Sequence, residues 1–218
     1  MSDFIPNFDK QELTLSNEFW KVELLLERGN NVTQKQIVNK TIELGEPSEW
    51  ISNLRIKTIT KNNIVKSCLL SGLDGGIYLH TANDEEKSYS VKLIDNILIF
   101  SLGFRFLAFD IEKQEIKWSI KPDTTEIFEF YDLQEDFLVR GEHEIHRIDK
   151  DGQIKWSYGG RDIWVNIDGE IEVIIETDKI LLTDFNNNKY VIDFNGKILE
   201  DKPYIRPISK KQKWWKFW

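Results

Sequence analysis

Histidine, carboxylate and aromatic side chains are the groups in this sequence that could support chemistry, and their spacing separates the possible uses. The run EHEIH at residues 142–146 places two histidines three residues apart between acids. Zinc-protease helices instead carry two histidines four residues apart on one helical face. On a strand, His143 and His146 point to opposite faces. The pattern therefore favours a polar surface strand over a metal site.

The segment DKDG at residues 149–152 resembles the start of a calcium-binding loop. Such a loop requires further oxygen ligands and an acidic twelfth residue, and the twelfth position here is Gly160. The same Asp-x-x-Gly spacing recurs at residues 193–196, which favours turn chemistry. The chain also has three histidines and one cysteine, Cys68, so few nucleophile–base pairs are possible. We expect no metal, no cofactor and no enzymatic activity.

The stretch WSYGGRDIW at residues 156–164 is the most unusual one. It has two interpretations. In the first, Arg161, Asp162 and Trp164 line a binding pocket, with Arg161 as a polar anchor. In the second, an Arg–Asp pair braces a turn and the tryptophans fill the core. Aromatic residues at repeated positions usually belong to a core, which favours the second interpretation.

These motifs lie in a sequence that repeats. LIFSLGFRFLAFD at 98–110, FLVRGEHEIHRID at 137–149 and LLTDFNNNKYVID at 181–193 align without a gap. Each copy ends in an aspartate, namely Asp110, Asp149 and Asp193. Asp-Gly at 151–152 and Asn-Gly at 195–196 supply the positive φ angles that tight hairpins need. The chain therefore contains at least three related units.

Each unit reads as four antiparallel strands. An apolar run precedes each copy, at 88–94, 125–131 and 170–176, and a short return follows each aspartate, to Trp118, Trp156 and Leu199. Four strands in about 40 residues is the plan of a β-propeller blade. The run FRFLAF at 104–109 is apolar on both faces, as a sheet between two neighbours requires. The sequence predicts an all-β, propeller-like array of four or five blades.

The pattern is weaker upstream. At 64–84 we expect a hairpin that turns at Gly75-Gly76, between Leu69-Leu70 and Ile77-Leu79. Residues 12–48 are predicted to form another hairpin or blade, and 47–51 a short helix. One domain is expected over 1–202, followed by a basic, aromatic tail at 203–218.

A strand that ends in Asp, a glycine-bearing turn and then Ile-Lys-Trp resembles the blades of quinoprotein-like and WD-repeat-like β-propellers. The resemblance covers about residues 64–200. The Gly-His and Trp-Asp signature of WD repeats is missing, so the chain would be a divergent relative. Quinone-binding enzymes of this kind are far larger and carry cofactor residues not recognisable here. The resemblance therefore implies a fold and no activity.

Charge gives the best indication of a partner. Acidic residues gather at equivalent places in two successive repeats, at 123–144 and 168–178. They predict a surface that steers a basic partner and repels nucleic acid, with plain solubilising surface as the alternative. The predicted partner-binding acids are Glu126, Glu129, Asp132, Glu135, Asp136, Glu142, Glu144, Asp168, Glu170 and Glu172.

The C-terminal residues have the opposite character. PYIRPISKKQKWWKFW at 203–218 has five basic residues, no acid and four aromatics in its last five positions. Such a segment can lie at a membrane interface, stack on single-stranded nucleic acid, supply a closing strand or dock on the acidic body. We expect docking, because four exposed aromatics would make an adhesive surface.

Composition limits the remaining function classes. The formal charge is −8 over 218 residues, which argues against a chain that binds phosphate backbones. No apolar run is long enough to span a bilayer, and the first residues do not read as a secretory signal. We expect a cytoplasmic, bacterial, protein-binding module, monomeric when free. Its sharpest form is an immunity-type protein that neutralises a basic toxin such as a nuclease; the alternative is a lectin-like propeller that binds carbohydrate.

Overall fold

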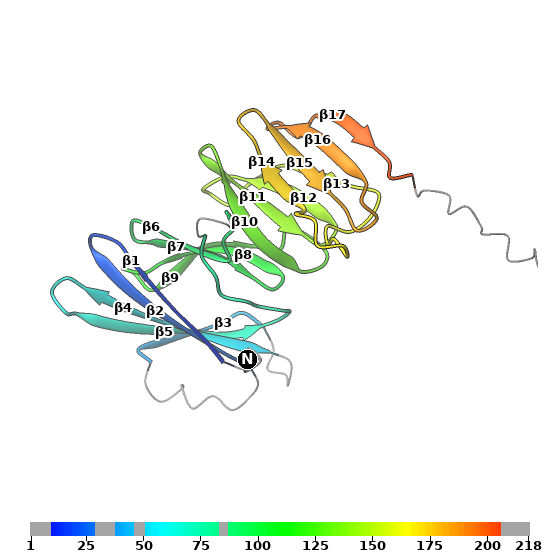
Figure 1. Ribbon diagram of the computed structural model, residues 1–218. Helices are drawn as coiled ribbons and strands as arrows, with labels where there is room; N and C mark the ends of the chain where they lie inside the picture. The colour runs from blue at the N-terminus through cyan, green and yellow to red at the C-terminus, as the bar shows by residue number, and fades with distance from the viewer. Residues whose placement is uncertain (1–9, 29–37, 46–50, 83–86, 206–218) are drawn as a thin grey trace, which may run out of the picture.

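The described part of the molecule is built from strands and turns. The computed structural model describes residues 10–28, 38–45, 51–82 and 87–205, which form four sheets and no helix. Figure 1 shows the sheets in one curved row, with the N-terminal sheet at one end and β14–β17 at the other. Most of the segment predicted as a short helix, at 47–51, lies outside the described residues.

Three sheets are four-stranded antiparallel meanders, which we call blades 1 to 3. Blade 1 consists of β6 (Val91–Ile94), β7 (Ile97–Leu102), β8 (Arg105–Asp110) and β9 (Glu115–Ile120). Blade 2 consists of β10 (Ile127–Leu133), β11 (Asp136–Gly141), β12 (Glu144–Ile148) and β13 (Ile154–Gly159). Blade 3 consists of β14 (Val173–Ile175), β15 (Lys179–Thr183), β16 (Lys189–Asp193) and β17 (Ile198–Lys202). The aligned copies fall on the two middle strands of each blade, so the predicted blade plan is confirmed.

The N-terminal sheet departs from this plan. Its order is β1-β2-β4-β5-β3, with β3 parallel to β5. The strands are β1 (Lys10–Ser16), β2 (Trp20–Arg28), β3 (Lys40–Glu43), β4 (Ser52–Thr60) and β5 (Val65–Leu73). The hairpin predicted at 64–84 is wrong, because β4 and β3 already pair with both edges of β5. Ile77 and Leu79 instead enter the core between this sheet and blade 1.

Apolar clusters fill the spaces between successive sheets. On β8, Leu107 and Phe109 join the cluster shared with the N-terminal sheet, whereas Phe106 and Ala108 join the cluster shared with blade 2. A third cluster lies between blades 2 and 3. Burial on both faces explains why β7 and β8 are apolar at most positions.

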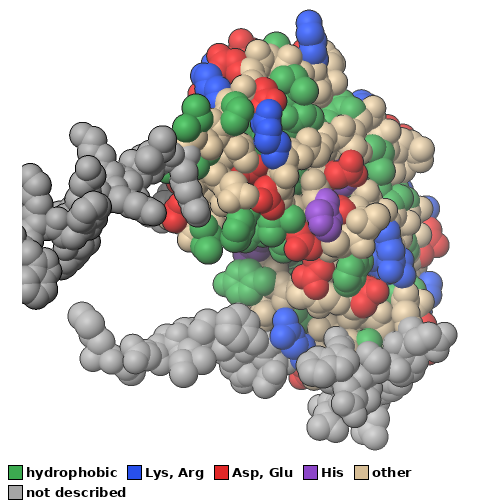
Figure 2. All heavy atoms as spheres, turned by 90° about the vertical axis from the view of Figure 1, so that its right-hand side faces the viewer, with side chains coloured by type: hydrophobic (Ala, Val, Ile, Leu, Met, Phe, Trp, Pro, Cys, Tyr) green, Lys and Arg blue, Asp and Glu red, His purple; other side chains and the backbone are tan. Residues whose placement is uncertain are grey.

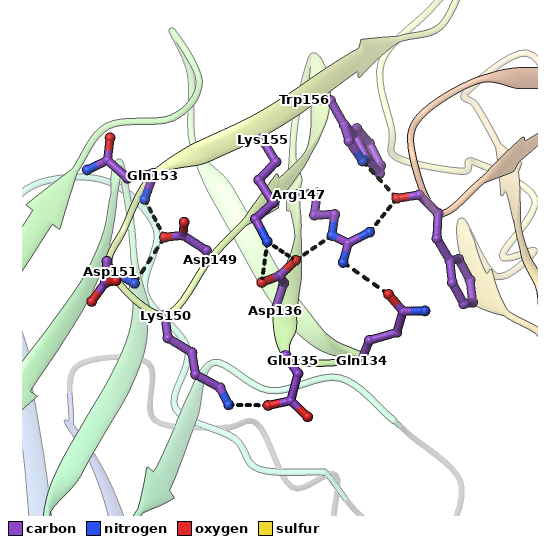
Figure 3. A network of polar contacts seen from close by, with 11 residues as sticks. Gln134, Glu135, Asp136, Arg147, Asp149, Lys150, Asp151, Gln153, Lys155 and Trp156 are labelled. Carbon is purple, nitrogen blue, oxygen red and sulfur yellow. Dashed lines mark hydrogen bonds and ion pairs between the residues drawn. The ribbon is translucent and has the colours of Figure 1, made fainter.

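A tryptophan joins each blade to the next. The indole N–H of Trp118 on β9 donates to the Lys150 carbonyl of blade 2, 2.8 Å away, and that of Trp156 on β13 donates to the Phe194 carbonyl of blade 3, 2.9 Å away. Each acceptor directly follows the aspartate that ends a repeat. We call this contact the tryptophan lock; Figure 3 shows the second one, in which Arg147 also reaches the Phe194 carbonyl, at 2.7 Å.

The tryptophan lock explains why the repeat turns of blades 2 and 3 contain a glycine. A Cβ added to Gly152 would lie 2.7 Å from the Trp118 ring, and one added to Gly196 would lie 2.8 Å from the Trp156 ring. Both glycines have positive φ, and each turn is closed by the aspartate, whose Oδ1 accepts two backbone N–H groups. The Asp-x-x-Gly motif is thus a turn that receives an indole.

The N-terminal sheet reaches blade 1 by other means. Its Lys40 and Lys66 ammonium groups donate to the Gln114 and Glu112 carbonyls of the first repeat turn, at 2.9 and 2.6 Å. Here the turn has no glycine, and no tryptophan of the described residues donates to its carbonyls. Lysine side chains therefore replace the lock where the blade plan is not followed.

We expect replacement of the lock to destabilise the fold measurably. Trp156→Ala removes the ring and the hydrogen bond, which should lower the free energy of unfolding by about 3 kcal/mol. Trp156→Phe keeps most of the ring and loses the donor, so about 1 kcal/mol is expected. Urea unfolding followed by circular dichroism measures both.

Two glycine substitutions separate the lock from backbone strain. Gly169 has φ of 76°, close to the 78° of Gly196, and no atom within 4 Å of an added Cβ. Gly169→Ala should cost about 1 kcal/mol through strain alone, and Gly196→Ala should cost clearly more. Equal losses for the two variants would contradict the lock.

Candidate functional site

A groove of about 730 Å³ lies beside the first strands of blades 2 and 3. One wall is β10, and the other is β14 with the segment that leads into it. Ala82 and residues 87–89, which precede β6, complete the lining. Tyr89 exchanges two backbone hydrogen bonds of 2.8 Å with Phe130 of β10. The groove is therefore formed by segments of three repeats, none of which contains it alone.

Arg140 on β11 is the polar centre of the groove. Its Nε lies 2.9 Å from Oε1 of Glu129, and its Nη1 lies 3.6 Å from Oε1 of Glu172. Nη1 also donates to the Trp164 carbonyl at 2.6 Å. One guanidinium thus connects β10 with the segment that enters blade 3.

Glu129 remains a carboxylate in this setting. Burial acts to raise its pKa, but the Arg140 guanidinium and the Tyr131 hydroxyl, which donates to Oε1, outweigh burial and hold the pKa below its ordinary value. The Glu129 carboxylate is largely buried and its charge is balanced by Arg140, so the pair stabilises the wall of the groove. It is poorly placed to act as an acid or base.

The rim of the groove carries acids that remain accessible. The side chain of Asp132 is 49% exposed and pairs with Lys92, and that of Glu170 is 50% exposed and pairs with Lys189 at 2.6 Å. Over the whole lining, four carboxylates face two cationic side chains. Exposed ion pairs of this kind are weak, so a cation from outside can exchange with the lysines.

The groove also offers an apolar surface and a strand edge. Tyr89, Tyr131, Ile171 and Val173 contribute to the lining, and Ile171 is 65% exposed. Among the described residues, β14 has a strand neighbour on one side only. Unpaired strand edges accept extended peptides by adding a strand.

The structure brings together four of the predicted acids and separates the others. Glu129, Asp132, Glu170 and Glu172 line the groove. The side chain of Glu135 pairs with Lys150 at the β10–β11 turn, and the buried Asp136 pairs with Arg147 and Lys155 (Figure 3). These last two acids stabilise blade 2 away from the groove.

The remaining predicted acids belong to connections between elements. The Glu126 carboxylate accepts a hydrogen bond from the backbone N–H of Gly76. Glu142 and Glu144 take part through their backbones: the Glu142 carbonyl accepts from the backbone N–H of Trp164, and the Glu144 N–H donates to the Asp123 carboxylate. Asp168 accepts from Asn187 at 2.7 Å. On the face shown in Figure 2, acidic side chains are interspersed with basic and apolar ones. Of the ten predicted acids, four therefore lie together in the groove and six lie outside its lining.

Of the two interpretations of residues 156–164, the binding pocket is wrong, and the favoured placement of tryptophan in the core is confirmed for Trp164. Trp164 is fully buried between blades 2 and 3, where it cannot contact a partner. Arg161 pairs with Asp201 of β17, and Asp162 contacts Asn186. All three residues therefore connect blade 2 to blade 3, because the Gly-Gly break lies between the two sheets.

The sequence interpretation missed Tyr89, Arg140 and Ile171. Arg140 is the only basic residue of its acidic segment, 123–144, and that isolation was the signal that it neutralises buried acids. No sequence pattern pointed to Tyr89 or Ile171, because each residue precedes a strand that lies outside the aligned copies.

The two histidines of the EHEIH run lie in different environments. The side chain of His143 is 51% exposed, whereas His146 is fully buried and its Nδ1 lies 2.8 Å from the Ser157 hydroxyl. Burial lowers the pKa of His146 to about 4. Within the described ranges, no three His, Cys, Asp or Glu residues gather in a way that would hold a metal ion.

The buried His146 predicts a pH-dependent stability. The unfolded chain protonates this histidine near its ordinary pKa of 6.5, whereas the folded chain does not do so until about pH 4. Stability is therefore lost as the pH falls through this window, by about 2 kcal/mol between pH 7 and pH 5. Denaturant unfolding at several pH values measures the loss.

Two histidine variants test whether His146 causes the pH dependence of stability. His146→Gln should flatten the dependence over this range, whatever it does to stability at pH 7. His143→Gln, the same change at an exposed position, should keep the wild-type slope. An unchanged slope in His146→Gln would refute the assignment.

Comparison with known proteins gives no family. No family model matches the chain, and neither does any curated protein. Among solved structures, the computationally designed Ika8 protein has a TM-score of 0.42 and 9% identity, covering 86% of this chain and 60% of that one. BamB from Moraxella catarrhalis has a TM-score of 0.42 and 10% identity, covering 88% of this chain and 63% of that one.

This chain therefore spans less than two thirds of either protein. Scores at this level carry no functional argument, and the fold follows from the sheets themselves. The chain is an all-β protein of propeller-like, four-stranded blades. In the part that the structure describes, no helix is long and apolar enough to cross a membrane.

Proposed function

We propose that this protein is a non-catalytic binding module that holds an extended, basic segment of a partner protein in the groove between β10 and β14. The observation that carries the proposal is the combination of an unpaired strand edge, an acidic rim and an apolar lining in one groove. Each feature matches a different part of such a ligand: its backbone, its basic side chains and its apolar side chains.

The alternating geometry of a strand supports this assignment. In an extended peptide, successive side chains point to opposite faces. A segment paired with β14 can therefore direct one set of side chains toward Tyr131 and Ile171 and the other toward Asp132 and Glu170. A ligand that alternates basic and apolar residues satisfies both sets.

The specific role we propose is immunity-type neutralisation of a basic toxin such as a nuclease. The support is the charge: residues 1–202 carry a formal −13, since the whole chain is −8 and residues 203–218 are +5. An acidic body accelerates association with a basic protein. The lectin alternative is not carried forward, because Trp118 and Trp156 form the locks.

A designed peptide tests the groove. We expect a heptapeptide of alternating Lys and Phe to bind with a dissociation constant in the micromolar range, on the order of −8 kcal/mol, and the Glu/Phe counterpart not to bind. Asp132→Lys should weaken binding about tenfold. Isothermal titration calorimetry at about 0.1 M salt measures both.

The matched control is Glu135→Lys, which makes the same charge change at a side chain that is 88% exposed and outside the groove lining. It should leave affinity within about twofold, because an exposed charge outside the lining interacts weakly with a bound peptide when salt screens it. Equal loss in both variants would show a general charge effect and contradict a groove site.

The toxin role has a separate test. Where a gene for a basic nuclease toxin adjoins the gene for this protein, co-expression should restore growth of toxin-producing cells, and Asp132→Lys should reduce the rescue. Colony counts with and without induction measure it. Failure of the wild-type protein to rescue would remove the immunity role and leave the peptide result standing.

A further inference from the structure

One rim of the groove holds a lysine of the protein itself against a carboxylate and an aromatic ring. The Lys92 ammonium, from β6, lies 2.6 and 2.5 Å from the two carboxylate oxygens of Asp132 on β10. The same ammonium lies 4.7 Å from the centroid of the Tyr89 ring. We call Asp132 and Tyr89 the ammonium cradle, because both contact this one charged group.

The two parts of the cradle are held together without help from Lys92. The Tyr89 backbone pairs with that of Phe130 on β10, and the two rings stack with their centroids 5.5 Å apart. The Tyr89 hydroxyl also donates to Oδ2 of Asp132 at 3.3 Å. The ring and the carboxylate are therefore positioned by β10 and by each other.

A ring beside a carboxylate is suited to an alkylammonium group. The carboxylate accepts charge-assisted hydrogen bonds, and the ring face attracts a cation within about 6 Å of its centroid. At the other rim, Glu170 pairs with the Lys189 ammonium, but no cation–ring contact joins Lys189 to an aromatic side chain of the described residues. The cradle is thus the more selective of the two rim positions.

Lys92 can leave the cradle without leaving a buried charge behind. Its side chain is 26% exposed and that of Asp132 is 49% exposed, so water reaches both groups once they separate. Lysine carries its charge on a flexible stem, and exposed ion pairs are weak. The contact is therefore able to open and close.

Other ion pairs near the groove cannot open in this way. Arg140 is largely buried and contacts two carboxylates and a backbone carbonyl at once. In blade 2, the buried Asp136 is held by two cationic side chains. Loss of the partner in either place would leave a buried charge unpaired, which is costly. Lys92 therefore differs from the cations that brace the blades.

We infer that Lys92 occupies, in the free protein, the position that a lysine of the bound partner takes in the complex. The inference rests on the proposed function, because the ligand lysine is one of the basic side chains of the segment held in the groove. On binding, the ligand ammonium replaces that of Lys92 in the cradle, and Lys92 turns toward the solvent. Lys92 thus sets the affinity of the groove for basic segments.

Competition from Lys92 lowers the apparent affinity. A ligand that needs an empty cradle binds more weakly in proportion to the fraction of molecules in which the cradle is empty. An exposed ion pair together with one cation–π contact keeps the cradle closed in about nine molecules out of ten. Removal of the Lys92 ammonium should therefore tighten binding about tenfold.

The variant Lys92→Met removes the ammonium and keeps an unbranched side chain. The heptapeptide of alternating Lys and Phe should bind it about tenfold more tightly than the wild-type protein in calorimetry at about 0.1 M salt. The matched control is Lys87→Met, because Lys87 is an exposed lysine of the groove lining that is not part of the cradle contact. It should change the affinity by no more than about twofold. Equal gains in the two variants would show a general charge effect and overturn the inference.

A small cation tests the cradle without the peptide. Butylammonium chloride should bind Lys92→Met with a dissociation constant on the order of 10 mM, and the wild-type protein about tenfold more weakly. Shifts of the Tyr89 and Phe130 amide signals in NMR spectra measure the binding, with sodium chloride at the same concentration as the salt control. Addition of Asp132→Asn to Lys92→Met should abolish it.

The two probes separate the cradle from the proposed groove ligand. If no variant binds the peptide and Lys92→Met still binds butylammonium, the groove ligand is wrong, and the cradle is supported as an alkylammonium site that Lys92 occupies. If the peptide binds but Lys92→Met neither gains affinity for it nor binds butylammonium, the inference is overturned and the proposed function stands. Circular dichroism establishes that each variant is folded, and Lys92→Gln repeats both measurements with a polar side chain.

Discussion

The contact of an indole with the repeat turn of the following blade is the interaction on which this structure depends. Trp118 and Trp156 each pack on a glycine and donate to the carbonyl two residues before it. A hydrogen bond fixes direction, whereas apolar packing between sheets does not. The locks therefore set how one blade sits on the next, and the apolar clusters supply most of the stabilisation.

The groove is a consequence of this arrangement. The second lock and the Arg140 contacts both connect blade 2 to blade 3, one beside the repeat turn and one beside the inner strands. With the two blades held at both places, β10 and β14 remain side by side with a space between them. The acids of the rim are part of a surface that the blade packing creates.

Motifs that suggest chemistry are structural in this fold. Asp149 closes a turn with its carboxylate, and His146 packs inside blade 2 as a neutral ring. Trp164 fills the space between blades, and its carbonyl accepts from Arg140. Such residues are distinctive in the sequence because a small set of contacts between blades requires particular side chains. The exposed residues of the groove, in contrast, are not distinctive in the sequence.

The sequence by itself determined the blades and their strands, because each repeat encodes its apolar strands and the aspartate of its turn locally. It also indicated four of the groove acids through their charge. Only the tertiary structure decided that β3 pairs in parallel with β5, that Trp164 is buried and that Tyr89, Arg140 and Ile171 share a groove. These are contacts between segments far apart in the chain, and local patterns carry no information about which distant segment a side chain meets.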